Sequence, residues 1–147
     1  MENLKTGHVG LSVTDLKKSV TFYRSIFQFE VIEEITSGDR QFAFLGYDGA
    51  TVLTLWQQSS NVFNPDHAGL HHLAFEVDDV ATVRRLEATV RAMGAHLRSD
   101  RSGAYRETSS ACRFFFCDPD GVRLEIYAAT SAAPRGRLVG PPACGLY

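Results

Sequence analysis

Two histidines and one glutamate occupy positions where strand periodicity places them on like faces. In "HVGLSV" the apolar residues alternate with His8, and in "HLAFEV" they alternate with His72 in the same way. In "VRLEIY", Glu125 lies between two apolar residues in the middle of a strand. A carboxylate that was only solvated would add little to stability at such a position. Successive strand residues point to opposite faces. Two imidazoles and one carboxylate on like faces could form a two-His-one-carboxylate metal site with open coordination positions.

The spacing leaves a structural alternative open for each of these residues. A strand histidine is often a partly buried, hydrogen-bonded residue, and Glu125 could pair with Arg123 or Arg113. By strand alternation, His71 falls on the same face as the apolar residues Leu73 and Phe75. We therefore expect it to pack in the core or face away from the site. Gly10 and Ala74 each lie two residues beyond a histidine and leave room for a ligand there.

These residues belong to an internal repeat. "HVGLSVTDL" (8–16) aligns with "HLAFEVDDV" (72–80), and both segments begin with histidine and end beside an acidic helix-capping signal. Apolar residues at helical spacing follow in each copy and predict helices over 15–27 and 79–94. The sequence therefore repeats a strand–helix unit.

Short extended segments follow each predicted helix. The sequence predicts strands at the following positions: 29–35, 40–47 and 51–57 in the first copy, and 95–100, 112–117 and 122–128 in the second. "DG" and "DPDG" are tight-turn signals before the last strand of each copy. The prediction is an α+β fold of two β-α-β-β-β modules within a single domain, 1–147. Its parts are module one (about 5–58), a linker (59–69), module two (about 70–128) and a C-terminal tail (129–147).

Composition excludes several classes of function. The 147 residues include 15 basic and 17 acidic side chains, interspersed and with a formal net charge of −2, so we expect no nucleic-acid partner. About 18 consecutive apolar residues would be needed for a spanning helix, and the sequence has no such stretch. The N-terminus shows no secretory signal pattern. Three cysteines form no disulfide framework, and we expect a reduced, cytoplasmic protein.

The chain resembles the vicinal oxygen chelate superfamily, which includes glyoxalase I, bleomycin-resistance proteins, fosfomycin-resistance enzymes and extradiol dioxygenases. The resemblance covers about residues 5–128 and rests on "HVGLSVTDLKKSVTFYRSIFQFEV", "GLHHLAFEVDD" and "FFFCDPDGVRLEIY". It implies that the two modules form an open cup-shaped mixed sheet with the helices outside. It also implies one divalent metal ion held by His8, His72 and Glu125.

The resemblance also suggests a reaction class. Thr54 aligns with Glu125, where glyoxalase I enzymes supply a fourth ligand, so a three-ligand site is expected. The implied activity is metal-dependent dioxygenase, lyase or isomerase chemistry on vicinal oxygens of a small organic substrate, with Glu125 as the catalytic residue. The metal would be Fe²⁺, Mn²⁺, Ni²⁺ or Zn²⁺, and no single subfamily pattern is matched.

Strand alternation places further residues on the face where a substrate would bind. Thr54, Trp56, Arg123 and Tyr127 share the predicted site face, and Glu76 is the nearby carboxylate that could act as a base. The alternative function is an antibiotic-resistance protein that sequesters a drug in the cup without chemistry. We expect a homodimer, because exposed sheet edges need cover, and the apolar tail is a candidate to lie on the partner. We expect no membrane partner.

Overall fold

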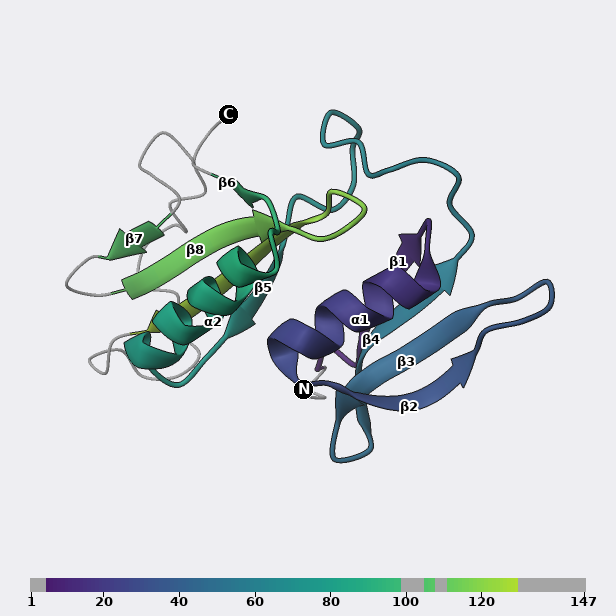
Figure 1. Cartoon of the computed structure of the whole chain (residues 1–147), viewed down its shortest axis with the longest axis horizontal. Coiled ribbons are helices and arrows are strands. Elements are labelled where there is room, and N and C mark those ends of the chain that lie inside the picture. The colour runs from purple at the N-terminus through teal and green to yellow at the C-terminus, as the bar shows by residue number, and fades with distance from the viewer. Residues whose placement is uncertain (1–4, 99–104, 108–110, 130–147) are drawn as a thin grey trace. The chain divides into compact units, whose positions relative to one another are not determined.

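The computed structural model describes residues 5–98, 105–107 and 111–129 (Figure 1). The chain divides into two compact units. Unit 1 runs to Asn64 and also contains Pro119–Gly121, and unit 2 comprises Pro65–Asp118 and the residues from Val122 onward. Most of the predicted C-terminal tail lies outside the described residues, although its first residue, Ala129, ends the last strand.

Unit 1 is a four-stranded sheet with one helix. Its strands follow the order β1-β4-β3-β2, in which β1 and β4 are parallel and the other pairs are antiparallel. Asp48 and Gly49 have φ values of 48° and 75°, which form the tight turn that "DG" predicts. The elements are β1 (Val9–Val13), α1 (Leu16–Phe27), β2 (Glu30–Ile35), β3 (Phe42–Tyr47) and β4 (Ala50–Gln57).

Unit 2 repeats this plan. Its strands follow the order β5-β9-β8-β6, with β5 and β9 parallel, and β7 pairs with β8 outside that path. The elements are β5 (Leu73–Glu76), α2 (Val80–Ala92), β6 (Leu97–Arg98), β7 (Tyr105–Glu107), β8 (Ala111–Cys117) and β9 (Arg123–Ala129).

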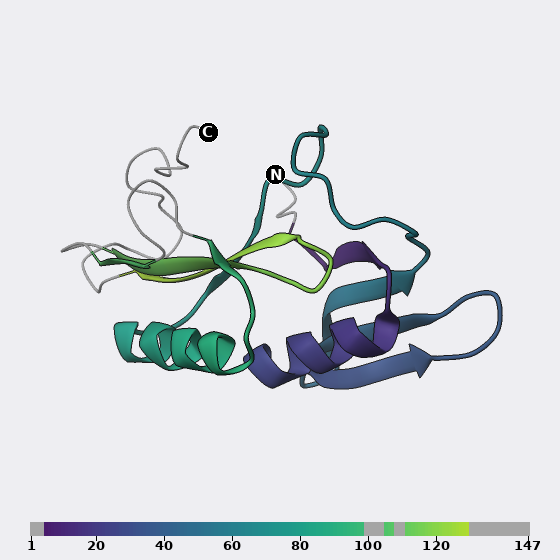
Figure 2. The same ribbon diagram turned by 45° about the horizontal axis from the view of Figure 1, so that its top comes forward.

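Both helices begin at an aspartate cap. The Asp15 side chain accepts a hydrogen bond from the Lys18 backbone N–H (2.9 Å), and Asp79 accepts one from Thr82 (2.7 Å). Such caps satisfy backbone donors that the first helical turn leaves unpaired. Each helix covers one face of its own sheet (Figure 2). The fully buried residues on that face include Leu53, Leu55, Leu124 and Ile126.

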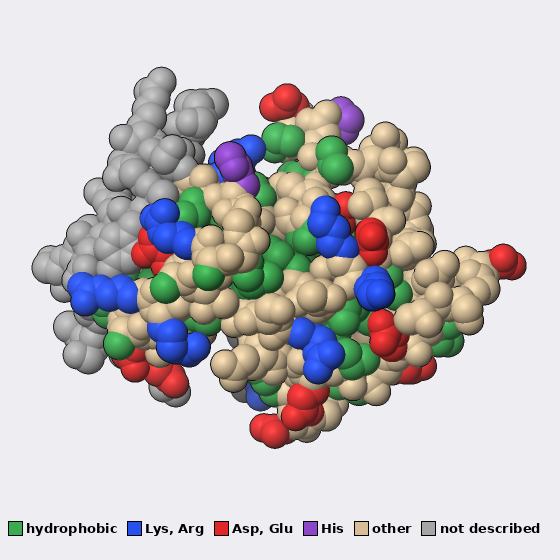
Figure 3. Space-filling view, in the orientation of Figure 1, with side chains coloured by type: hydrophobic (Ala, Val, Ile, Leu, Met, Phe, Trp, Pro, Cys, Tyr) green, Lys and Arg blue, Asp and Glu red, His purple; other side chains and the backbone are tan. Residues whose placement is uncertain are grey.

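The predicted α+β class is confirmed, and each module has the predicted strand–helix–strand order. One strand was not predicted: β7 pairs with β8 in the register Tyr105↔Phe114. Three residues give too short a segment for periodicity to show, and pairing with β8 defines the strand instead. Among the described residues, no helix is long and apolar enough to cross a membrane. On the face seen in Figure 3, basic and acidic side chains are interspersed.

The turn between β8 and β9 is held by a buried carboxylate of unit 1. Asp120 is 3% exposed. Its oxygens accept hydrogen bonds from the Thr14 backbone N–H (3.2 and 3.3 Å) and hydroxyl (2.5 Å). The Asp120 carbonyl also accepts from the Phe63 N–H (2.8 Å). Asp120 therefore ties the turn to the end of β1.

We predict that Asp120→Ala lowers the free energy of unfolding by about 2 kcal/mol, because the Thr14 backbone N–H and hydroxyl lose a buried, charged acceptor. Urea denaturation measures the change. Asp39→Ala is the control, since Asp39 is exposed in the loop between β2 and β3 and its loss should change stability by no more than about 0.5 kcal/mol. Equal effects of the two variants would contradict the prediction.

Candidate metal centre

The structure brings together two of the three predicted metal ligands. His72 immediately precedes β5, and Ala74 of that strand is in register with Glu125 of β9. His72 Nε2 lies 3.3 Å from Glu125 Oε2, and the two side chains are 20% and 10% exposed. Two donors that are each about 2.0–2.2 Å from one ion, roughly 90–110° apart, are separated by about 2.8–3.6 Å. The nitrogen and oxygen donors therefore fit a single divalent ion.

Burial and a neighbouring cation act in opposite directions on Glu125. Burial raises the pKa of its carboxyl group, and the charge and hydrogen bond of Arg113 lower it. Arg113 Nη1 lies 3.5 Å from Glu125 Oε1, on the oxygen that does not face His72. Of the two arginines that could pair with Glu125, Arg113 is the one that does. The arginine stabilises the ionised carboxylate, which is the form that binds a metal.

The surroundings of His72 favour the neutral form of its imidazole. Burial lowers the pKa of the imidazole, and the charges of His71, Arg123 and Arg113 lower it further. A metal displaces a proton from a protonated imidazole, so a low pKa favours metal binding. His72 is thus biased toward the form that coordinates, whereas the pKa of Glu125 is raised overall because burial outweighs the effect of Arg113.

The expectation that His71 packs in the core or faces away is wrong. His71 is exposed, and its Nδ1 lies 2.7 Å from His72 Nδ1. Strand β5 begins only at Leu73, so strand alternation does not extend back to His71. A metal-binding histidine commonly uses its second ring nitrogen for an orienting hydrogen bond. His71 is placed to orient His72 in this way.

The third predicted ligand, His8, belongs to unit 1. It is exposed and immediately precedes β1. Within the described parts of the chain, no cluster of three or more His, Cys, Asp or Glu side chains is arranged to hold a metal ion. The contact between His72 and Glu125 on unit 2 is observed, and the roles of His8, His72 and Glu125 as metal ligands stay predictions.

Thr54 occupies the position in unit 1 that Glu125 occupies in unit 2. Gly10 is in register with Thr54, just as Ala74 is with Glu125. Thr54 is 4% exposed, and its hydroxyl accepts a hydrogen bond from Trp56 Nε1 (3.1 Å). A Cβ atom on Gly10 would lie 3.2 Å from that hydroxyl, which is tight contact. Thr54 therefore has a structural role in positioning the indole.

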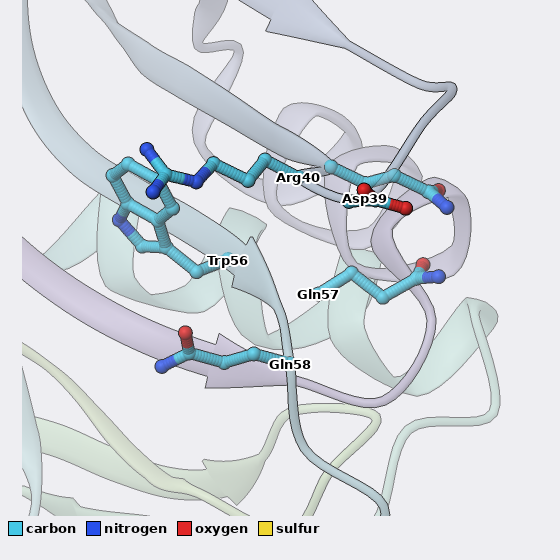
Figure 4. A pocket seen from close by; sticks show the side chains of 6 residues that line it. Asp39, Arg40, Trp56, Gln57 and Gln58 are labelled. Atoms are coloured by element: carbon cyan, nitrogen blue, oxygen red, sulfur yellow. The ribbon is translucent and has the colours of Figure 1, made fainter.

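Trp56 belongs to an aromatic cluster beside a polar hollow. Its ring centroid lies 5.0 Å from that of Phe42 and 6.0 Å from that of Phe44. The hollow has a volume of about 290 Å³ and is lined by Asp39, Arg40, Gln41, Trp56, Gln57 and Gln58. Figure 4 shows the Trp56 indole with the side chain of Arg40 above it and that of Gln58 below it. An aromatic wall with polar groups suits a small organic ligand.

The other two predicted substrate contacts lie on unit 2. Tyr127 donates a hydrogen bond to Glu76 Oε2 (3.3 Å), and Arg123 Nη1 lies 3.5 Å from His71 Nε2. Arg113 and Phe115 were not predicted as site residues. Three successive phenylalanines in "RFFFC" show no alternation of polar and apolar residues. Antiparallel pairing across the "DPDG" turn nevertheless places Phe115 beside Glu125. Register counted from that turn could have identified both residues.

Comparison with known proteins gives a consistent match. The model of the Glyoxalase/Bleomycin resistance protein/Dioxygenase superfamily matches residues 5–126. The chain is similar to the protein YaeR of Escherichia coli (strain K12), with 32% identity covering 82% of this chain and 92% of that protein. It is also similar to the metallothiol transferase FosB of Staphylococcus epidermidis, with 26% identity covering 88% and 85% of the two chains.

A solved structure shares the fold. It is a mutant of the fosfomycin resistance protein FosX from Listeria monocytogenes, in complex with Mn(II) and 1S,2S-dihydroxypropylphosphonic acid. The TM-score is 0.67 at 21% identity, and the match covers 89% of this chain and 95% of that chain. This likeness shows the fold.

We predict that Thr54→Val shifts the fluorescence of Trp56 and lowers stability by about 1 kcal/mol, because the indole N–H loses its acceptor. Trp56 is the only tryptophan in the sequence, so its emission reports on this site alone. Thr54→Ser keeps the hydroxyl and should keep the emission spectrum. Metal content should not change in either variant. Loss of metal in Thr54→Val would instead make Thr54 a ligand.

Proposed function

Because this chain belongs to the Glyoxalase/Bleomycin resistance protein/Dioxygenase superfamily, we propose that it is a divalent-metal-dependent enzyme acting on a small organic molecule. The proposed chemistry is that of a dioxygenase, lyase or isomerase that chelates vicinal oxygens of its substrate. The observation that carries the proposal is the 3.3 Å separation of His72 Nε2 and Glu125 Oε2. The metallothiol transferase FosB and the Mn(II) complex of FosX support it.

We propose His8, His72 and Glu125 as the metal ligands. His8 is included because its position in the repeat matches that of His72, and each precedes a strand that pairs in parallel with the last strand of its module. Nitrogen and oxygen ligands suit Fe²⁺, Mn²⁺, Ni²⁺ or Zn²⁺. The FosX complex favours Mn²⁺ among these.

A bound divalent ion would supply Lewis-acid chemistry toward substrate oxygens. Glu125 is the proposed catalytic residue. Glu76 is the proposed base, and Tyr127, which donates a hydrogen bond to it, would hold its carboxylate in place. Burial raises the pKa of the Tyr127 phenol, and the charge of Glu76 raises it further, so Tyr127 remains a donor at neutral pH.

The proposed substrate contacts differ between the two units. Trp56 offers a flat aromatic surface, which Thr54 orients through the indole N–H. Arg123 and Tyr127 offer a guanidinium and a phenol on the face that carries Glu125. Stacking and hydrogen bonding of this kind would orient a small molecule.

We also propose a cytoplasmic location, because the three cysteines of the sequence form no disulfide framework. A chain without such a framework is typical of a reducing compartment.

We predict that His72→Ala abolishes metal binding, because two remaining ligands hold a divalent ion too weakly to retain it against buffer. Metal analysis of protein purified without chelators measures this, and the wild type should carry about one ion per chain. His72 lies off the core face, so the free energy of unfolding should change by no more than about 1 kcal/mol. Turnover, once a substrate is known, should disappear together with the metal.

Two other histidines provide the controls. His71→Ala should retain the metal with affinity lowered about 10- to 100-fold, because His71 would orient His72 without binding the ion. His96→Ala, at an exposed position before β6, should behave as wild type. If all three variants hold metal equally, the assignment of His72 is wrong. A wild type that binds its small molecule without any metal would favour the alternative, sequestration of a drug without chemistry.

We also propose that the protein is a homodimer. Strand β2 lies at one end of its sheet and exposes Ile32 (38%) and Ile35 (42%). An edge strand with exposed apolar side chains has unpaired backbone groups and can pair with a strand of another chain. Light scattering at micromolar concentration should give twice the mass of one chain, and a monomer at that concentration would contradict the proposal.

A further inference from the structure

Strand β2 forms one outer edge of the unit 1 sheet. Among the described strands it pairs with β3 only (Figure 1). An edge strand presents a row of backbone N–H and C=O groups that its own sheet does not use. Ile32 and Ile35 are exposed along this strand, and Tyr47 is exposed at the end of β3. The edge therefore offers backbone hydrogen-bonding groups together with apolar side chains.

The same strand is strongly acidic. Glu30, Glu33 and Glu34 are all exposed, so three of its six residues carry a carboxylate. The register with β3 places Glu33 beside Phe44 and Glu34 beside Ala43, and these two positions lie on opposite faces of the sheet. A strand added to this edge would therefore meet negative charge on both of its faces.

A second copy of β2 is a poor partner for this edge. Like charges opposite one another across two strands are destabilising, and two copies of β2 would bring their glutamates together. The register of β2 also shifts between Val31 and Glu33, which is an irregularity of the bulge type. Charged side chains and bulges are devices by which edge strands avoid pairing with copies of themselves. The partner that fits this edge is an extended segment with basic and apolar side chains.

The C-terminal tail has the composition that this edge requires. It contains two arginines and no aspartate or glutamate. In an extended conformation Arg135, Arg137 and Val139 share one face. Glu33 and Ile35 share one face of β2 in the same way. Basic and apolar side chains of the tail thus recur at the spacing of the acidic and apolar side chains of the edge.

We propose that the run "RGRLV", residues 135–139 of one copy of this chain, docks on the β2 edge of a second copy as an added strand. Strand addition of this kind takes its affinity from backbone hydrogen bonds, and the two arginines select this edge by charge-assisted pairing with its carboxylates. Exchange of tails between two copies is reciprocal, so it closes as a symmetric dimer. The inference rests on the proposed homodimer and is independent of the proposed metal centre.

Charge reversal in the full chain tests this docking, with the dimer dissociation constant measured by analytical ultracentrifugation. Glu33→Arg combined with Glu34→Arg should raise the constant about 10- to 100-fold, because like charges would then face one another across the interface. Arg135→Glu combined with Arg137→Glu should raise it by a similar factor. The four substitutions together restore opposite charges and should bring the constant back toward the wild-type value.

A matched control and a second readout accompany these variants. Lys17→Glu combined with Lys18→Glu reverses two exposed charges on α1, and its dimer should be as stable as that of the wild type. Hydrogen exchange should show protected β2 amides in the wild type. That protection should be lost in the variant with Arg135→Glu and Arg137→Glu, in which β2 itself is unchanged.

The other outcomes overturn the proposal in distinguishable ways. A dimer that every variant forms equally well would overturn the docking of the tail and leave the homodimer standing. Failure of the four substitutions to restore the dimer would overturn the pairing of these charges. A monomeric wild type would overturn both the docking and the homodimer. Metal content should be the same in all variants, and a wild type without metal would contradict the proposed metal function alone.

Discussion

The parallel pairing of the first and last strands of each module is the constraint on which the site depends. It places Gly10 beside Thr54 in unit 1 and Ala74 beside Glu125 in unit 2. Parallel strands need a crossover connection, and in each module this connection includes a helix that packs on one face of the sheet. The face that the helix covers is therefore lined by apolar residues. The opposite face keeps the small residues Gly10 and Ala74 in register with Thr54 and Glu125.

Keeping Glu125 on that second face has an energetic cost. The residue is 8% exposed, and its strand neighbours Leu124 and Ile126 are fully buried on the other face. A carboxylate in such surroundings is stable only with compensating partners. Arg113 compensates part of the charge, and His72 faces the remaining oxygen. A hydrophobic residue would pack there with less cost, so the charged group is better explained by function than by stability.

Strand alternation made much of this predictable from sequence. It identified the opposed faces of β9, the equivalence of Thr54 and Glu125, and the face that His72 shares with Glu125. It failed where its premise failed: His71 precedes the start of β5, and its contacts are set by loop geometry instead. The partnership of Arg113 with Glu125 was also left undecided. It depends on antiparallel register between β8 and β9, which hydrophobic pattern alone does not define.

The repeat preserves backbone pairing while the chemistry of its side chains diverges. In unit 1 the face opposite the helix holds Phe42, Phe44 and Trp56 around a neutral threonine. In unit 2 the equivalent face concentrates arginine, histidine and glutamate around Phe115. Such divergence is possible because these positions lie off the core, so a change there leaves the packing of the opposite face intact. The same pairing rule thus gives one unit an aromatic surface and the other a charged one.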